Sequence, residues 1–178
     1  AMPLTFGGGI DSVETARKCM SAGIDKVCLN STAIREPGLI DRLVHVFGSQ
    51  AVVLGVDVVG GKGQRRVFAH MTGKPVDGLD IMDWIQEAVG RGVGEIRLTS
   101  VDREGARGGM DLQLLAEVMS VADVPIVLEG GAGTLAHLRE AFESGASGIA
   151  VGTMLVFSDN NILKLKRFLA NEGCNVRS

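Results

Sequence analysis

Tyrosine is absent from this sequence, and tryptophan occurs only once. Proteins that bind single-stranded nucleic acid stack the bases on aromatic side chains, so no such platform is expected. The sequence also lacks a strong excess of either positive or negative charge, because the net charge is −3 and no block of like charges occurs. Nucleic acids and anionic membranes are bound mainly through concentrated positive charge. We therefore expect neither a nucleic acid nor a membrane as a partner.

Long apolar runs are missing as well. No stretch reaches the ~18 residues that cross a bilayer, and the N-terminus lacks the pattern of a signal peptide. The three cysteines, Cys19, Cys28 and Cys174, are odd in number and have no metal-ligand spacing. We expect them to be buried free thiols in a reducing compartment. The expected location is the cytoplasm.

Histidine is equally rare. His45 and His137 fall within predicted helices, and His70 falls within a predicted hairpin. No two of the three have the spacing of a zinc site. We therefore expect no metal, no cofactor and no histidine in the functional site.

Glycine, in contrast, is abundant. The 25 glycines among 178 residues are about twice the average usage. They fall singly or in short clusters between apolar runs, which is typical of an enzyme with many tight turns. The length suits one domain with a sizeable core, spanning residues 1–178.

Short, mostly continuous apolar runs alternate with helical patterns along the whole chain. Such runs predict parallel strands covered on both faces, while capping residues and glycines mark the helix ends. The predicted strands are Pro3–Phe6, Lys26–Asn30, Ala51–Val56, Glu95–Ser100, Pro125–Leu128 and Gly148–Val151. The predicted helices are Ser12–Ala22, Pro37–Phe47, Asp80–Arg91, Asp111–Val121, Thr134–Ser144 and Asn160–Asn171. Six βα units in series fit a parallel α/β architecture, either an open sheet or a barrel.

One loop is enlarged. The segment Val58–Gly78 follows the third strand, alternates polar and apolar residues over 66–70, and contains the turn Gly73-Lys74-Pro75. We interpret it as a short hairpin inserted after that strand.

An internal repeat decides between the two architectures. Residues 4–32 align with residues 126–154 without a gap, which pairs Gly8 with Gly130, Gly9 with Gly131 and Ser31 with Thr153. Two further strand–helix units separate the copies, as expected of a duplicated four-strand half. The repeat predicts a (β/α)8 barrel of the TIM type. Six units are present, so the first two are expected to precede residue 1, which makes this a domain truncated at its N-terminus.

Both copies of the repeat carry the parts of a phosphate site. In parallel βα folds the functional residues lie at the carboxyl ends of strands. A Gly-Gly turn lets backbone N–H groups approach an anion, and the following helix adds a favourable dipole. Either turn alone is also compatible with an ordinary tight loop. Two copies, each with a hydroxyl on the next strand, predict a substrate with a phosphate at each end: Gly8, Gly9 and Ser31 in one copy, Gly130, Gly131 and Thr153 in the other.

Several charged residues are candidates for chemistry. Asp57 follows an apolar strand, so its burial could produce a general acid or base. Asp102 and Glu104 lie in the loop after another strand, where they are either catalytic or part of a salt-bridged turn. Lys26 and Glu95 begin their strands, so they would lie at the opposite end of the barrel, as a stabilising pair or as a gate.

Five segments resemble the cyclase subunit of imidazole glycerol phosphate synthase, an enzyme of histidine biosynthesis. They are LTFGGGI, DKVCLNSTA, FGSQAVV followed by Asp57, GEIRLTSVDREG and EGGAG. The similarity covers essentially the whole chain, including the hairpin and the closing NEGCNVR. The order FGSQ, LTS-x-D-R and GGAG is specific, and it separates this family from the histidine-pathway isomerase with the same duplicated barrel.

The resemblance implies a lyase-type cyclisation without a cofactor. The family's bis-phosphorylated substrate is a phosphoribulosyl-formimino aminoimidazole carboxamide ribonucleotide, whose imidazole ring is closed with ammonia from a glutaminase partner. Asp57 would be one of two catalytic aspartates, and Lys26 and Glu95 would belong to the gate at the ammonia entrance. The residues that match substrate- or phosphate-contacting positions are Asn30, Ser31, Thr99, Asp102, Gly105, Gly131, Gly152 and Thr153.

Three departures from the family pattern leave alternatives open. The other catalytic aspartate lies on the family's first strand, which is expected to precede this chain. Glu104 stands in place of the usual aspartate, and Glu129 stands where serine is common. A carboxylate beside a phosphate site would repel the phosphate unless it is turned away. The alternatives are a paralogue that uses ammonia for surface-polysaccharide sugar amidation, an inactive barrel fragment, and a phosphate-binding module without chemistry.

Six strands of an eight-stranded barrel would leave two unpaired edges, at Pro3–Phe6 and Gly148–Val151. Exposed strand edges pair readily with other chains. We therefore expect self-association through these edges.

Overall fold

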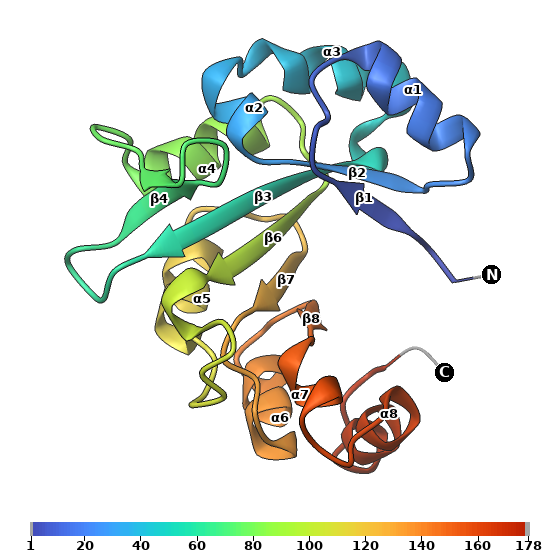
Figure 1. The fold of residues 1–178 in the computed structure, drawn as a ribbon, viewed down its shortest axis with the longest axis vertical. Helices are drawn as coiled ribbons and strands as arrows, with labels where there is room; N and C mark the ends of the chain where they lie inside the picture. The colour runs from blue at the N-terminus through green and yellow to red at the C-terminus, as the bar shows by residue number, and fades with distance from the viewer. Residues whose placement is uncertain (1, 177–178) are drawn as a thin grey trace.

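A computed structural model describes residues 2–176 of the chain. Eight strands and eight α-helices follow one another, mostly in alternation (Figure 1). The strands are β1 Thr5–Gly7, β2 Lys26–Leu29, β3 Val52–Val59, β4 Arg66–Ala69, β5 Lys74–Pro75, β6 Glu95–Ser100, β7 Ile126–Glu129 and β8 Gly148–Ala150. The helices are α1 Val13–Ser21, α2 Ser31–Arg35, α3 Gly38–Phe47, α4 Ile81–Gly90, α5 Leu112–Met119, α6 Leu135–Glu143, α7 Thr153–Val156 and α8 Ile162–Asn171.

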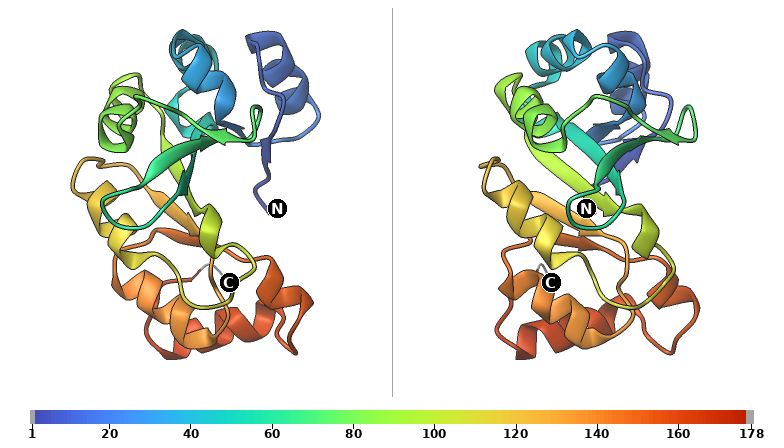
Figure 2. Two further views of the ribbon diagram at one scale, coloured as in Figure 1. Left: turned by 60° about the vertical axis from the view of Figure 1, so that its left-hand side comes forward. Right: turned by 90° about the vertical axis from the view of Figure 1, so that its left-hand side faces the viewer.

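Six of the strands form one parallel sheet in the order β1-β2-β3-β6-β7-β8. The sheet curves into an open arc with the helices along its outer side, and both chain ends lie on the open side of the arc (Figures 1 and 2). This is an α/β fold of the (β/α)-barrel type, as the alternation of elements and the repeat predicted. None of the helices between residues 2 and 176 is long and apolar enough to cross a membrane.

The two faces of the sheet have different chemistry because successive side chains of a strand point to opposite faces. On β3 the alternating residues Val52, Leu54, Val56 and Val58 are fully or almost fully buried in the core beneath the helices. The residues between them face the inside of the arc, where Asp57 is 0% exposed. The apolar core therefore lies between sheet and helices, and polar groups are concentrated on the inner face.

The repeat predicted from the sequence is present in three dimensions. Helices α1 and α6 occupy equivalent residues of the two copies, and each begins at a capping hydroxyl. Ser12 accepts a hydrogen bond from the backbone N–H of Thr15, and Thr134 accepts one from that of His137. Such caps stabilise a helix start by about 1 kcal/mol. The short helices α2 and α7 also correspond, although the sequence did not predict either of them.

The predicted hairpin is confirmed, with one correction to the strand before it. Strand β4 pairs antiparallel with the end of β3, and β5 pairs antiparallel with β4. Because of this pairing β3 continues to Val59 instead of ending at Val56. Asp57 therefore lies within a strand, where it pairs with Thr99 of β6, and not in the loop after it.

Candidate active site

The carboxylate of Asp57 lies at the centre of a polar cluster on the inner face of the sheet. Asn30 Nδ2 donates to Asp57 Oδ2 over 2.7 Å, and His70 Nε2 lies 2.9 Å from the same oxygen. Arg97 donates from a terminal guanidinium nitrogen to Asp57 Oδ1 over 3.3 Å. Both carboxylate oxygens are thus held in place, while the Asp57 side chain is 1% exposed.

These side chains come from four different segments of the chain. Asn30 follows β2, Asp57 lies on β3, Arg97 lies on β6, and His70 follows β4 in the hairpin. Parallel register brings the first three together, since β3 pairs with β2 on one side and with β6 on the other. The hairpin then places His70 over the end of β3.

A cavity of about 520 Å³, the first cavity, opens beside Asp57. The turn Gly7–Gly9 forms one wall, and Gly8 and Gly9 have φ angles of 101° and 72°. Positive φ is accessible to glycine at little cost and strains other residues. The other residues that line this cavity include Cys28, Asn30, Ser31, Asp57, His70, Met71 and Arg97. The predicted glycine turn and the predicted catalytic carboxylate therefore share one cavity.

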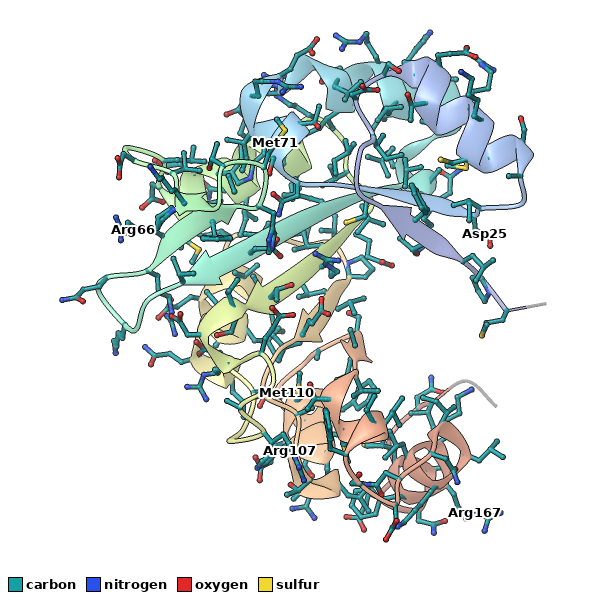
Figure 3. All side chains as sticks on the ribbon, viewed as in Figure 1. Asp25, Arg66, Met71, Arg107, Met110 and Arg167 are labelled. Carbon is teal, nitrogen blue, oxygen red and sulfur yellow. The ribbon has the colours of Figure 1, made fainter. Side chains whose placement is uncertain are left out.

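The hairpin forms another wall of this cavity through His70 and Met71. The backbone N–H of Met71 donates to Ser31 Oγ over 3.3 Å, and Ser31 Oγ donates to Asn30 Oδ1 over 3.0 Å. Figure 3 shows Met71 at the hairpin next to α2. Ser31 therefore joins the predicted first phosphate site to the hairpin and to the partner of Asp57.

A second, smaller cavity of about 100 Å³ lies at the ends of β7 and β8. Gly130 and Gly131 have φ angles of 96° and 91°. The close packing here requires glycine, because a Cβ on Gly131 would lie 2.1 Å from the carbonyl oxygen of Gly109. The residues that line this second cavity include Glu104, Gly105, Glu129, Gly130, Gly131, Gly152 and Thr153. The predicted second glycine–hydroxyl set is thus brought together.

The loop after β6 covers the second cavity. The backbone N–H of Gly109 donates to the carbonyl oxygen of Gly131 over 2.9 Å. The same loop carries Arg107 and Met110 (Figure 3), and Arg107 has a positive φ of 58°. A Cβ on Gly133 would lie 2.2 Å from the carbonyl oxygen of Arg107. Backbone from two βα loops therefore meets at this end of the site.

Two of the predicted candidates occupy different surroundings. Asp102 Oδ2 accepts a hydrogen bond from the backbone N–H of Gly60 over 2.6 Å, which ties the loop after β6 to the loop after β3. Asp102 borders a separate hollow with Lys62 and Arg103 and lines neither of the two cavities. Glu104 lines the second cavity. Of this carboxylate pair, Glu104 alone faces the predicted substrate site.

Lys26 and Glu95 begin β2 and β6, at the end of the sheet opposite the cavities. Lys26 Nζ lies 2.5 Å from Glu95 Oε2, and the side chains are 31% and 18% exposed. The contact reaches across β3, which separates their two strands. The predicted ion pair is therefore present at the amino-terminal end.

Arg97 and Glu129 form a contact that the sequence analysis did not predict. Arg97 Nε lies 3.4 Å from Glu129 Oε2, and Thr99 Oγ1 donates to that oxygen over 3.1 Å. Arg97 thus lies between two carboxylates, those of Asp57 and Glu129. Burial alone lowers the pKa of the Arg97 guanidinium, but nearby Cys28, Asp57 and Glu129 outweigh it and raise that pKa above its ordinary value. Arg97 is therefore a permanent positive charge inside the arc.

The sequence analysis expected no histidine in the site and did not predict that His70 lies 2.9 Å from Asp57. No sequence spacing places His70 near Asp57, because only the antiparallel pairing of β3 with β4 does so. A signal for Arg97 did exist. It alternates with Glu95 and Thr99 along β6, so a period of two places all three on the face that carries the gate and site candidates.

An open parallel sheet whose strand ends carry a buried carboxylate and two glycine-lined cavities defines an α/β-barrel protein with its candidate site at the carboxyl ends of the strands. The chain belongs to the histidine biosynthesis protein family, which it matches over residues 1–161.

Individual relatives in this family carry one common description. A protein of Wolinella succinogenes described as imidazole glycerol phosphate synthase subunit HisF is 40% identical over 177 residues, which is 99% of this chain and 70% of that protein. Proteins with the same description from Chloroherpeton thalassium and a Thermotoga species are 42% and 39% identical, over 99% of this chain and 70% and 69% of their own length.

Proposed function

We propose that this chain is a cyclase of the imidazole glycerol phosphate synthase type, which acts in histidine biosynthesis as a lyase. The observation that carries the proposal is the position of Asp57 on the first cavity, in a chain about 40% identical to proteins of that description. The substrate would be the bis-phosphorylated phosphoribulosyl-formimino aminoimidazole carboxamide ribonucleotide. Ammonia would close its imidazole ring.

Two cavities at the ends of the same sheet suit a substrate with two phosphates. One phosphate would lie against Gly8, Gly9 and Ser31, and the other against Gly130, Gly131, Gly152 and Thr153, with Gly105 beside them. Backbone N–H groups in glycine turns bind phosphate because no side chain obstructs a close approach. The reacting carbons would then lie between the two cavities, next to Asp57 and Thr99.

In ring closure the ammonia nitrogen forms two C–N bonds, one to the ketone carbon and one to the formimino carbon. The ketone oxygen leaves as water, and the aminoimidazole carboxamide ribonucleotide leaves as an amine when its bond to the formimino carbon breaks. Protons must therefore move between the nitrogen and oxygen atoms. Asp57 would be the general acid or base for these transfers. Asn30 and Arg97 hold its oxygens from either side. His70 lies 2.9 Å from Oδ2 and is 58% exposed, so it would exchange protons between the carboxylate and solvent.

Ammonia would enter from the opposite end of the sheet. Lys26 and Glu95 form an ion pair at that end of β2 and β6, and this pair would open for ammonia. A glutaminase subunit docked over these residues would supply the ammonia without releasing it to water. The amino-terminal end of the strands is thereby proposed as the docking face.

A complete barrel of this type needs eight parallel strands, and the sheet of residues 2–176 has six in parallel order. We propose that further polypeptide pairs with the edges of β1 and β8. It would correspond to the first two βα units of the duplicated barrel and would bring the second catalytic aspartate. The cytoplasm is proposed as the site of this chemistry.

The test measures ring closure of the bis-phosphate substrate with an ammonium salt in place of the glutaminase. Asp57→Asn should lower the rate at least about a hundredfold, and His70→Gln about tenfold, if these groups move protons. His45→Gln is the matched control, because His45 lies exposed on α3, away from both cavities. Turnover that survives Asp57→Asn would contradict the assignment. Stabilisation by phosphate without turnover would instead indicate a binding module, and neither effect would indicate an inactive fragment.

A second candidate function, amidation of a surface-polysaccharide sugar with ammonia, is favoured by one observation. Glu129 lines the second cavity, where the resembled family commonly has serine. A carboxylate there suits a hydroxyl-rich sugar, which donates hydrogen bonds. Turnover of an amidatable sugar nucleotide in place of the bis-phosphate would select this function.

A further inference from the structure

Glu129 poses an electrostatic problem for the proposed function. It directly precedes Gly130 and Gly131 and lines the second cavity, where a phosphate is proposed to bind. Two negative charges a few ångströms apart repel each other strongly when they are partly shielded from water. The Glu129 side chain is 29% exposed, so water only partly screens it.

The inner face of β6 supplies the compensating charge. Arg97 pairs in register with Gly55 on β3 and with Val127 on β7, and Val127 in turn pairs with Gly148 on β8. The two glycines have no side chain, which leaves room for a guanidinium on the inner face of the sheet. Two residues further along the same three strands, Asp57, Thr99 and Glu129 lie side by side. The Arg97 guanidinium thus lies between the carboxylates of Asp57 and Glu129.

Glu129 Oε2 has two side-chain contacts, and both are with residues of β6. Arg97 Nε lies 3.4 Å from this oxygen, and Thr99 Oγ1 donates to it over 3.1 Å. Nothing else in the described chain forms an ion pair with Glu129. The nearby Arg103 is engaged elsewhere, since it donates to the carbonyl oxygen of Gly109 over 3.0 Å and lies 3.8 Å from Asp111.

We propose that Arg97 and Glu129 are a matched pair that sets the specificity of the second cavity: Arg97 neutralises Glu129 and turns it inward, so that the Gly130–Gly131 turn accepts a phosphate. Arg97 is then a positioning residue for both ends of the site, because the same guanidinium also holds Asp57. This inference rests on the proposed function, in which the second cavity binds one phosphate of the substrate.

The pair predicts effects that are not additive. Arg97→Leu leaves Glu129 uncompensated and should weaken phosphate binding at the second cavity about tenfold or more. Glu129→Gln keeps the side-chain size and removes the charge, so binding there should be equal or tighter. The double variant has neither charge and should bind within about threefold of the unaltered protein. Arg97→Lys keeps the charge and should bind almost normally.

The experiment titrates inorganic phosphate into isotope-labelled protein and follows the backbone amides of Gly130 and Gly131 by NMR. The amides of Gly8 and Gly9 report the first cavity in the same spectrum, and Glu129→Gln should leave their titration unchanged. The amide spectrum also verifies that each variant is folded, and Arg97→Lys provides a second route if Arg97→Leu does not fold. Recovery of Gly130 and Gly131 binding in the double variant supports the pair.

The outcomes separate this inference from the proposed function. If phosphate shifts Gly130 and Gly131 in the unaltered protein but the double variant binds as weakly as Arg97→Leu, the matched pair is wrong and the phosphate site stands. If phosphate never shifts these amides in the unaltered protein, the proposed phosphate site itself fails, and the inference fails with it.

Discussion

At the scale of single residues, the inner face of the sheet concentrates polar groups that an apolar core would exclude. Arg97, Asp57 and Cys28 lie within one region, and the charges of Arg97 and Asp57 are paired. A buried charge is tolerated when it is paired and hydrogen-bonded. These paired polar groups beside the first cavity provide a site for polar chemistry.

Cys28 gives a prediction at this scale. Its side chain packs between glycines of the two neighbouring strands. A Cβ on Gly7 would lie 3.2 Å from Cys28 Cβ, and a Cβ on Gly55 would lie 3.1 Å from Cys28 Sγ. Burial raises the pKa of the Cys28 thiol from 9.0 to about 11, although nearby Arg97 lowers it. The unfolded chain therefore loses this proton at lower pH than the folded chain does.

As pH rises from about 9 to 11, the unfolded state binds fewer protons, so the free energy of unfolding should fall by about 2 to 3 kcal/mol because of this thiol. Cys28→Ser should lack that part of the loss. Urea denaturation of both proteins at pH 8 and pH 11 measures the difference. The absence of tyrosine removes one other group that titrates in this range. An identical decline in both proteins would show that Cys28 is not responsible.

At the scale of elements, the sequence predicted most of what local physics determines. All six parallel strands and six of the eight helices were found, since apolar runs, caps and glycines mark them. The ends of the elements shifted by one to three residues where pairing extends a strand, as at Val59. The helices α2 and α7 were missed because they have five and four residues, too few to show a helical period.

The candidate site was predicted in part for a related reason. Glycine turns, hydroxyls and Asp57 lie at strand ends, which the chain order alone identifies. The hairpin brings His70 next to Asp57, and Asp102 accepts a hydrogen bond from the backbone N–H of Gly60. Contacts of this kind depend on how loops fold over one another. Sequence patterns do not encode that geometry.

The hairpin that carries His70 gives a prediction at the element scale. Arg65, just before β4, forms ion pairs with Asp111 and Glu117, and its side chain is 8% exposed. These contacts fasten the base of the hairpin to α5. Removing one partner of a buried ion network leaves the others uncompensated, so Arg65→Met should destabilise the protein by about 3 kcal/mol. Chemical denaturation measures this change.

Arg66→Met is the matched control. Arg66 is the next residue, 57% exposed, and lies 3.7 Å from the almost fully exposed Asp77. Exposed pairs of this kind contribute little, so the midpoint of unfolding should hardly move. Hydrogen exchange at β4 should accelerate in Arg65→Met alone. Equal stability of the two variants would show that the network does not anchor the hairpin.

At the scale of the whole molecule, the sheet has two free edges among the described residues. Strands β1 and β8 each have one neighbouring strand. Around the β1 edge Met2, Leu4 and Phe6 are 79%, 46% and 43% exposed. Apolar side chains next to unpaired N–H and C=O groups form a surface that binds other strands readily.

We therefore predict that the 178-residue chain associates with itself through these edges, because a second copy offers complementary unpaired strands. Light scattering coupled to size-exclusion chromatography should give a mass of at least two chains at micromolar concentration. Phe6→Lys places a charge on the β1 edge, which opposes edge pairing, and should shift the mass toward 18.7 kDa. Gln86→Lys adds the same charge to an exposed position of α4, which precedes the central strand β6, and should leave the mass unchanged. A monodisperse monomer of the unaltered chain would contradict the prediction. Added polypeptide that restores the missing pairing should suppress association, because it would occupy the same edges.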